Sequence, residues 1–528
     1  VDPPATAGGT DPAQQRLMTR TNELAQKWSH LSPAKQELLE KRLRGKRPTE
    51  SLAARRNGEQ IPLSFMQQRL WFLNQLEPDN TIYNVPAAVR LQGNLNVEAL
   101  ERTLSEIIRR HQSLRTTFTD VNGSPVQVIK PAEPVKLLHS DLTGWPRAER
   151  ETRARELAKA EALRPFDLNH GPLLRVTLLH LDQDEYVALL NMHHIVSDGV
   201  SMSLLVQEIM SIYQAFRLDQ PSPLPELPAQ YADFAVWQSA RLQGDVLQRE
   251  LNFWRRELGG ELPRLNLRTN QPRTVTPTHK GGSAPLKLSP ELTEDLRSLC
   301  RREGVTMFMA LLAAYVSLLH CFSGQSDIIV GSPISQRKRA RFEDLIGCFI
   351  DTLVLRTNLE GDPGFLALLA RVKETALNAY NHSDVPFDKI VEEVQPRGSR
   401  GQTPIFQVWM NLEKSSAVEL QLPELTLSTF PLEKQWSKFD LALLIQDRSE
   451  IIDCVFEYDT DLFDTKTISR YASAFETIVS MVVAEPETKL SGLNEMLAEQ
   501  DRQARLIEER EYQDSIKRKL SGVRRRAV

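Results

Sequence analysis

The sequence predicts an α/β protein built from two lobes. With 528 residues, the chain is too long for a single hydrophobic core of ordinary size. In both halves, segments with helical periodicity alternate with short apolar segments of strand length. Four prolines interrupt regular structure near the midpoint of the chain, where we expect the lobe boundary: Pro221, Pro223, Pro225 and Pro228.

The individual elements follow from the spacing of apolar residues. Helical periodicity marks residues 97–111, 201–216, 290–304 and 306–322. Nearly continuous apolar runs, typical of buried strands, mark residues 186–192, 326–335 and 345–359. The two halves therefore share one α/β pattern, which suggests an ancient duplication, although they contain no literal repeat.

These patterns divide the chain into four parts. Residues 1–60 are predicted to form a leader, a helix and a linker, because a Pro- and Gly-rich start gives way to a short helical segment and then to basic, polar residues. Residues 61–225 are the predicted first lobe and residues 226–487 the predicted second lobe. Residues 488–528 are polar, end in a basic cluster, and are predicted to be a linker.

Composition argues against several classes of protein. Lys and Arg (65) nearly balance Asp and Glu (69), which does not favour nucleic acid as a partner. No apolar run reaches the roughly 18 residues that span a bilayer, and residues 1–15 do not resemble a signal peptide. The four cysteines lack CxxC spacing, which disfavours disulfides and zinc. We therefore expect a cytoplasmic protein without membrane contact.

The segment richest in chemistry is NMHHIVSDG, residues 191–199, which follows an apolar strand and precedes a helix. Adjacent residues on a strand point to opposite faces, so at most one of His193 and His194 projects readily into a given cavity. Asp198 follows in the loop, and Gly199 is placed for a turn or a close backbone approach. Acid–base catalysis and a purely structural role both fit this pattern. A metal site fits less well, because the two imidazoles diverge and no further ligand motif is near.

The heptapeptide HHIVSDG resembles the HHxxxDG signature of condensation domains of nonribosomal peptide synthetases, which belong with the chloramphenicol-acetyltransferase-like acyltransferases. Further motifs of that family are matched in the same order, from about residue 61 to residue 487. They are IPLSFMQQRLWFL (61–73), RRHQSLRTTF (109–118), YADFAVWQ (231–238), IGCFIDTLVLR (346–356), HSDVPFDKIVEEV with PIFQVWMNL (382–394 and 404–412) and SKFDLALLI (437–445).

This resemblance implies a fold and an activity. The fold would be a V-shaped pseudo-dimer of two chloramphenicol-acetyltransferase-like lobes, each a two-layer α+β unit, with a central tunnel. The activity would be amide-bond formation between a donor acyl or peptidyl thioester and an acceptor aminoacyl thioester. Phosphopantetheine arms of donor and acceptor peptidyl carrier proteins would deliver both substrates, and the donor carrier could also be a polyketide acyl carrier protein. Neighbouring synthetase domains are expected partners, and the chain itself is expected to bind no cofactor or metal.

The resemblance also implies roles for the motif residues. His194 would be the active-site residue in the tunnel, acting either as a proton acceptor or as a group that only orients the amine. His193 would pack behind it. Asp198 would form a structural ion pair with Arg337 across the lobes, and Gly199 would leave space for substrate beside His194.

Other features of the match concern two supporting arginines and the subtype. Arg69 and Arg115, in the first two motifs, are expected to brace the first lobe rather than to contact substrate. The form of the motifs favours the subtype that joins an L-configured donor to an L-configured acceptor. Val200 stands where that subtype often has Trp, and Asp351 stands where Asn is usual in the fifth motif.

Three alternatives remain open at this point. One is a starter condensation domain with a fatty-acyl or polyketide donor. Another is a noncatalytic interface module that recruits a partner enzyme to a carrier protein. The third is a free-standing acyltransferase of related fold that uses an acetyl-CoA-type donor.

Overall fold

The structure is a computed structural model. It describes residues 60–273, 278, 280–394, 405–414, 421–422, 424–432, 436–503 and 506. The predicted leader and helix, and nearly all of the linker that follows them, therefore lie outside the described residues. The same holds for residues 507–528 of the predicted C-terminal linker.

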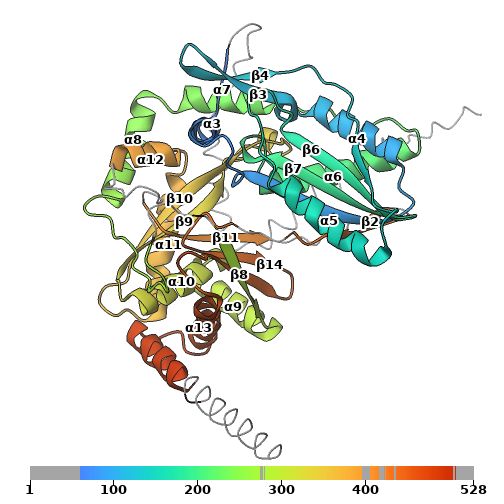
Figure 1. The fold of residues 1–528 in the computed structure, drawn as a ribbon. Helices are drawn as coiled ribbons and strands as arrows, with labels where there is room; N and C mark the ends of the chain where they lie inside the picture. The colour runs from blue at the N-terminus through green and yellow to red at the C-terminus, as the bar shows by residue number, and fades with distance from the viewer. Residues whose placement is uncertain are drawn as a thin grey trace, which may run out of the picture. The chain divides into compact units, whose positions relative to one another are not determined.

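A six-stranded sheet organises the first lobe, and Figure 1 labels its strands β2, β6 and β7. The strand order is β12–β13–β2–β7–β6–β5. Its strands are β2 (Asn84–Gly93), β5 (Leu138–Asp141), β6 (Leu174–Asp182), β7 (Glu185–His193), β12 (Gln421–Leu422) and β13 (Leu425–Thr429). β7 lies between β2 and β6 and is antiparallel to both. This central position explains its nearly continuous apolar sequence, since a central strand covered on both faces has no solvated side.

Helices and a small second sheet complete this lobe. The helices are α3 (Phe65–Leu76), α4 (Val97–Arg110), α5 (Arg147–Ala162) and α6 (Gly199–Arg217). The small sheet consists of β1 (Ile61–Pro62), β3 (Thr116–Val121) and β4 (Ser124–Ile129), in the order β1–β4–β3. α4 and α6 pack against each other, and Ile107, Leu205 and Ile212 are buried in the core beneath them.

A second six-stranded sheet organises the other lobe, in the order β10–β9–β11–β14–β15–β8. Its strands are β8 (Gly281–Leu288), β9 (Asp327–Ser335), β10 (Ile350–Asn358), β11 (Val408–Lys414), β14 (Leu441–Asp447) and β15 (Ile452–Asp459). β11 is parallel to β9 and β14, while the other neighbours are antiparallel. The labelled helices of this part are α7 (Tyr231–Arg241), α8 (Gly244–Glu257), α9 (Pro290–Glu303), α10 (Met307–Ser323), α11 (Phe365–Asn381), α12 (Phe387–Val394) and α13 (Thr465–Ala484), and residues 490–503 are also helical.

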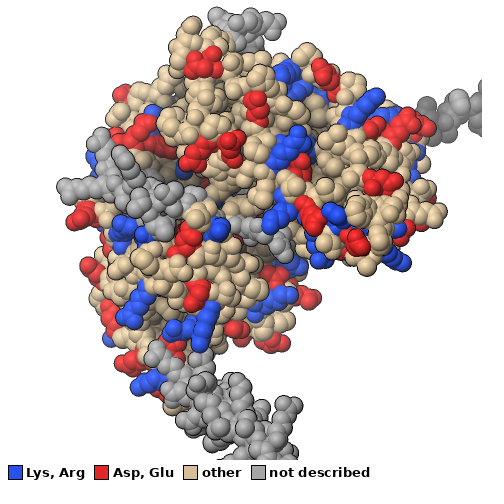
Figure 2. Space-filling model, in the orientation of Figure 1, with Lys and Arg blue, Asp and Glu red and all other residues tan. Residues whose placement is uncertain are grey.

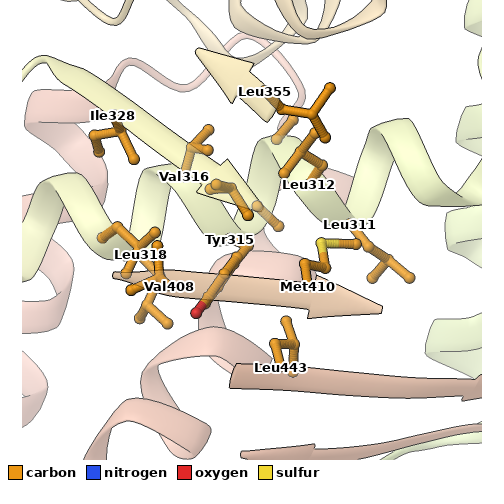
Figure 3. Packing of buried hydrophobic residues seen from close by; sticks show 14 of the residues in the cluster. Leu311, Leu312, Tyr315, Val316, Leu318, Ile328, Leu355, Val408, Met410 and Leu443 are labelled. Carbon is orange, nitrogen blue, oxygen red and sulfur yellow. The ribbon is translucent and has the colours of Figure 1, made fainter. Parts of the chain in front are cut away.

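The core of the second lobe is built around α10. Every residue from Met309 to Leu319 is buried, as expected for a helix that is apolar on all sides. Figure 3 shows Tyr315 of this helix close to Val408 and Met410 of β11 and to Leu443 of β14. Within the described part of the chain, no single helix is long and apolar enough to cross a membrane. α9 and α10 pass that test together by length and composition, with a bend of 106° between them.

The lobes exchange segments in ways that the predicted ranges do not describe. β13 comes late in the chain but pairs with β2 in the sheet of the first lobe. Tyr231, at the start of α7, shares a hydrogen bond of 2.8 Å with Ser64 of the first lobe. Leu490 and Leu493 lie in the core of the second lobe, although they fall in the range predicted as a linker.

The predicted α/β class is confirmed by this arrangement of helices and sheets. The V-shaped pseudo-dimer with a central tunnel stays a prediction. On the face drawn in Figure 2, positively and negatively charged side chains are interspersed rather than gathered into one field of a single sign.

Candidate active site

The motif residues lie at the junction between β7 and α6. β7 ends at His193, a short 3-10 helix spans His194–Val196, and α6 begins at Gly199. Asp198 is the N-cap of α6, and its side chain accepts a hydrogen bond of 2.8 Å from the backbone N–H of Ser201. An aspartate at this position satisfies an otherwise unpaired N–H and suits the positive end of the helix dipole. The loop is therefore short and fixed at both ends.

His193 packs inside the first lobe. The residue is 2% exposed, and its ring contacts Tyr83 and Phe166 at centroid distances of 6.5 and 6.0 Å. Its Nδ1 accepts a hydrogen bond of 3.1 Å from the backbone N–H of Ile195. Burial lowers the pKa of His193 to about 3, so the ring is neutral at pH 7. The structure places this ring in packing contacts behind the cavity.

His194, unlike His193, lines a cavity. Its backbone N–H donates to the carbonyl of Tyr83 at 2.8 Å. Its Nδ1 lies 3.7 Å from Sγ of Cys348. Burial, followed by the nearby positive charge of Lys438, lowers the pKa of His194 to about 4, against an opposing effect of Asp198. The ring is therefore neutral at pH 7.

Cys348 is a neighbour of His194 that residue-by-residue reasoning did not single out. It is 1% exposed, and burial raises the pKa of its thiol well above the usual range. The hydroxyl of Tyr231 donates to its carbonyl at 2.6 Å, which fixes the backbone beside His194. A side chain on Gly347 would overlap the ring of Tyr231, so this position needs glycine. The fifth motif contains Cys348, but nothing in its sequence signals a contact 154 residues away.

Asp198 and Arg337 form a buried ion pair between the lobes. Arg337 Nη1 lies 2.6 Å from Asp198 Oδ2, and the side chains are 6% and 3% exposed. The same carboxylate accepts the backbone N–H of Phe349 at 2.9 Å and both donors of Ser201 at 2.8 Å. The guanidinium also donates to the carbonyl of Leu345 at 3.1 Å. These hydrogen bonds offset the cost of burying the two charges.

Gly199 needs no special backbone conformation, since its φ is not positive. It lines the cavity, and a Cβ there would meet only Glu413 Oε1, at an ordinary 3.8 Å. Nothing in the described protein around it therefore requires glycine, and the idea that it leaves room for substrate stays a prediction.

The cavity has a volume of about 1340 Å³ and is lined by both lobes. α3, β2 and α5 contribute from the first lobe, and β9, β10, β11 and β14 contribute from the second. Part of its wall is aromatic, since Trp409 and Phe439 stack with centroids 4.7 Å apart. Its charged lining residues are Arg69, Glu77, Arg155, Glu156, Lys159, Asp351, Glu413, Lys438 and Glu457.

One predicted role is wrong. Arg69 was expected to brace the first lobe, yet it lines the cavity, and its Nε lies 3.6 Å from Asp388 Oδ1 of α12 in the second lobe. Its guanidinium also lies over the ring of Phe387, 5.2 Å from the centroid. The pattern of the first motif did not reveal that α3 presents this side chain to the other lobe. Arg115 remains within the first lobe, where it donates to the carbonyl of Lys130.

A metal centre is not evident in the described part of the chain, where no group of three or more His, Cys, Asp or Glu side chains could hold an ion.

Comparison with known proteins places this geometry in a family. The family model described as "Condensation domain" matches residues 57–505. The chain is 46% identical to a component of the linear gramicidin synthase of Brevibacillus parabrevis over 437 residues, which are 82% of this chain and 6% of that protein. It is 37% identical to phosphinothricin tripeptide synthetase PhsC of Streptomyces viridochromogenes over 470 residues, 88% of this chain and 43% of that protein. The chain therefore spans less than half the length of each of these relatives.

Solved structures show the same fold. The X-domain from teicoplanin biosynthesis matches with a TM-score of 0.75 and 27% identity, over 84% of this chain and 99% of that one. The first condensation domain of the calcium-dependent antibiotic synthetase, in complex with a substrate analogue, matches with a TM-score of 0.67 and 20% identity, over 82% and 98%. The family model over residues 57–505 and the 46% identity to the gramicidin synthase component show that the chain belongs to the condensation domain family of nonribosomal peptide synthetases.

Proposed function

We propose that this domain catalyses amide-bond formation between a donor acyl thioester and an acceptor aminoacyl thioester, both held on phosphopantetheine arms of carrier proteins. The observation that carries the proposal is the placement of His194. A neutral imidazole is presented to a cavity that both lobes line, and its backbone is fixed by Tyr83 and the short loop into α6. A cavity of about 1340 Å³ exceeds the roughly 300–1,000 Å³ typical of sites for one small molecule, which suits two substrates that meet inside it.

The reaction needs few groups from the protein. The neutral amine nitrogen of the acceptor attacks the thioester carbonyl carbon of the donor, and a tetrahedral intermediate forms. The carbon–sulfur bond then breaks, the amine loses one proton, and the donor arm leaves as a thiol. Holding the amine in line with the carbonyl supplies much of the rate, because it replaces an encounter of two separate molecules.

The pKa of His194 bears on its role in this step. A base whose conjugate acid has a pKa of about 4 is a poor acceptor for a proton on a free ammonium group, whose pKa is several units higher. We infer that His194 accepts a hydrogen bond from the attacking amine through Nε2 and orients it. Removal of a proton would follow only after attack, when the nitrogen of the intermediate is more acidic.

Further parts of the proposal concern the substrates and the location. We infer L-configured donor and acceptor residues from the forms of RHQSLRTTF (110–118) and IGCFIDTLVLR (346–356). The condensation domains of the matched multidomain synthetases support donor and acceptor carrier domains as partners. We also propose that the domain works in the cytoplasm, without a resident cofactor or metal.

A direct test uses a donor-loaded and an acceptor-loaded carrier protein, with product followed by intact-protein mass spectrometry. We expect His194→Ala to lower the rate of condensation at least a hundredfold, in the range that general acid–base and positioning groups contribute. The matched control is His170→Ala, since His170 is a surface residue outside the cavity. An unchanged rate in a folded His194→Ala variant would show that this residue is not catalytic. Parallel reactions with a D-configured donor test the stereochemical part.

A second function has one observation in its favour. The X-domain whose fold this chain shares was also solved in a complex with OxyB, at 29% identity and a TM-score of 0.75. An interface module would bind a carrier protein or partner enzyme yet form no product. The same mass-spectrometric assay separates the two functions, because wild-type protein that binds loaded carriers without any condensation would favour the interface module.

A further inference from the structure

Asp351 of β10 is a buried acid with one uncommitted oxygen. The residue is 6% exposed and lines the cavity. Its Oδ1 accepts the backbone N–H of Thr352 at 2.7 Å and that of Phe387 at 3.3 Å. Its Oδ2 has no hydrogen-bond partner within the described residues, and it is not among their fully enclosed unpartnered atoms. We take the accessible surface that remains on Oδ2 to face the cavity.

The charged groups around Asp351 do not compensate the negative charge of its carboxylate. Arg69 on α3 and Asp388 on α12 are the charged groups that affect it, and Arg69 Nε lies 3.6 Å from the carboxylate of Asp388. Burial, reinforced by Asp388 and opposed by the two backbone donors and Arg69, raises the pKa of Asp351 to about 7. A buried carboxyl oxygen without a partner is costly, and a ligand that supplies a hydrogen-bond donor removes that cost.

We propose that Asp351 is a specificity-determining residue of the cavity, and that its Oδ2 accepts a hydrogen bond from an N–H group of the bound substrate. The proposal rests on the proposed function, because aminoacyl and pantetheine groups carry amine and amide N–H donors. The direction of the bond follows from the site. Two backbone donors oppose the rise in the pKa of Asp351, and the ionised carboxylate, which is the majority form above pH 7, can only accept.

This direction gives a pH dependence with a definite sign. A donor ligand binds the ionised form, which is about a tenth of the protein at pH 6 and about nine tenths at pH 8 for a pKa of about 7. Apparent affinity scales with the population of the competent form. Binding should therefore tighten about tenfold from pH 6 to pH 8. The pKa of His194, at about 4, lies outside this interval.

The test measures binding of a glycyl-pantetheine analogue with an amide in place of the thioester, by titration calorimetry at pH 6 and pH 8. Asp351→Asn keeps an Oδ1 acceptor for the two backbone N–H groups and replaces Oδ2 by a donor. We expect this variant to bind the analogue more weakly than wild type at pH 8, by about tenfold or more, because it loses a charge-assisted hydrogen bond. It should also lack the tenfold pH response. Any change in affinity with pH that remains in this variant is the contribution of the ligand's own amine.

The matched control is Asp447→Asn, which removes a part-buried carboxylate from β14 of the same sheet, at a position outside the cavity. It should bind as wild type does. Equal affinity and equal pH response in Asp351→Asn and wild type would overturn the inference, as would wild-type binding that tightens toward pH 6. The pH response of the wild type is read against that of Asp351→Asn, because the ligand's amine also titrates between pH 6 and pH 8.

The two proposals fail separately. Condensation that depends on His194 but binding that ignores Asp351 would refute the inference and leave the proposed function standing. Asp351-dependent binding by a wild-type protein that forms no amide would refute the proposed function alone.

Discussion

The ion pair between Asp198 and Arg337 gives a prediction whose size follows from its surroundings. Asp198→Asn removes the negative charge but keeps a good N-cap, because Asn caps helices about as well as Asp. The charge of Arg337 then remains buried, at 6% exposure, without its counter-charge. Breaking one side of a buried pair costs about 3–5 kcal/mol.

That cost translates into a measurable shift in melting temperature. With an unfolding entropy of roughly 2.1 cal/mol/K per residue, a folded unit of this size loses about 1 °C per kcal/mol. We therefore expect Asp198→Asn to lower the calorimetric Tm by about 3–5 °C. Asp447→Asn is the matched control, since its pair with Arg297 has the same 2.6 Å separation but 13% and 23% exposure. That more exposed pair should contribute about 1 kcal/mol or less.

A double-mutant cycle separates the pair from its context. Asp198→Asn, Arg337→Gln and the combined variant should show a coupling energy of about 1–3 kcal/mol, because the second substitution removes the stranded charge. Additive shifts in Tm, or a loss no greater than that of Asp447→Asn, would refute the reasoning. Either result would mean that the contact between the lobes adds little to stability.

Three further predictions concern the residues around the loop. The ring of His194 should stay neutral down to about pH 5 in an NMR titration, because its pKa is about 4. A titration midpoint near that of free histidine would contradict the burial of this ring. Cys348→Ala should lower kcat about two- to fivefold with little change in KM, because the variant loses one weak hydrogen bond to the ring of His194. An unchanged kcat would show that the sulfur does not hold that ring in place. Gly347→Ala should lower the free energy of unfolding by about 1–3 kcal/mol or more, because the added methyl group overpacks the site beside Tyr231. Gly144 has open space around it, so Gly144→Ala should leave stability unchanged. Equal melting temperatures of the two variants would contradict the packing.

Much of the fold could be predicted from local pattern. The nearly continuous apolar run at residues 186–192 lies within β7, the run at residues 326–335 matches β9 to within one residue, and the apolar residues 306–322 largely form α10. A helix or strand that is buried on all sides has a nearly continuous apolar sequence. No such sequence pattern predicts that β13 joins the sheet of the first lobe. Leu425–Thr429 is a five-residue strand whose partner, β2, lies more than 300 positions earlier, and the pairing depends on backbone hydrogen bonds that any residue can make.

The site divides in the same way. The loop that carries His193, His194 and Asp198 is contiguous, so its motif could be read directly. Arg337 could be connected with Asp198 only by resemblance, because 139 residues separate them. The contact of Cys348 with His194 and the reach of Arg69 across the cavity could not be predicted, since both depend on how the two lobes face each other.

One short segment of the second lobe connects these features. Residues 345–351 supply the carbonyl that Arg337 binds, the N–H that Asp198 binds, the sulfur beside His194 and the free carboxyl oxygen of Asp351. A displacement of this segment would therefore disturb the ion pair, the histidine and the cavity wall together. Asp198→Asn should then lower kcat even well below its melting temperature, although Asp198 does not line the cavity. A variant with a lowered Tm but wild-type kcat would show that the segment keeps its position without the ion pair, and that stability and catalysis are separate here.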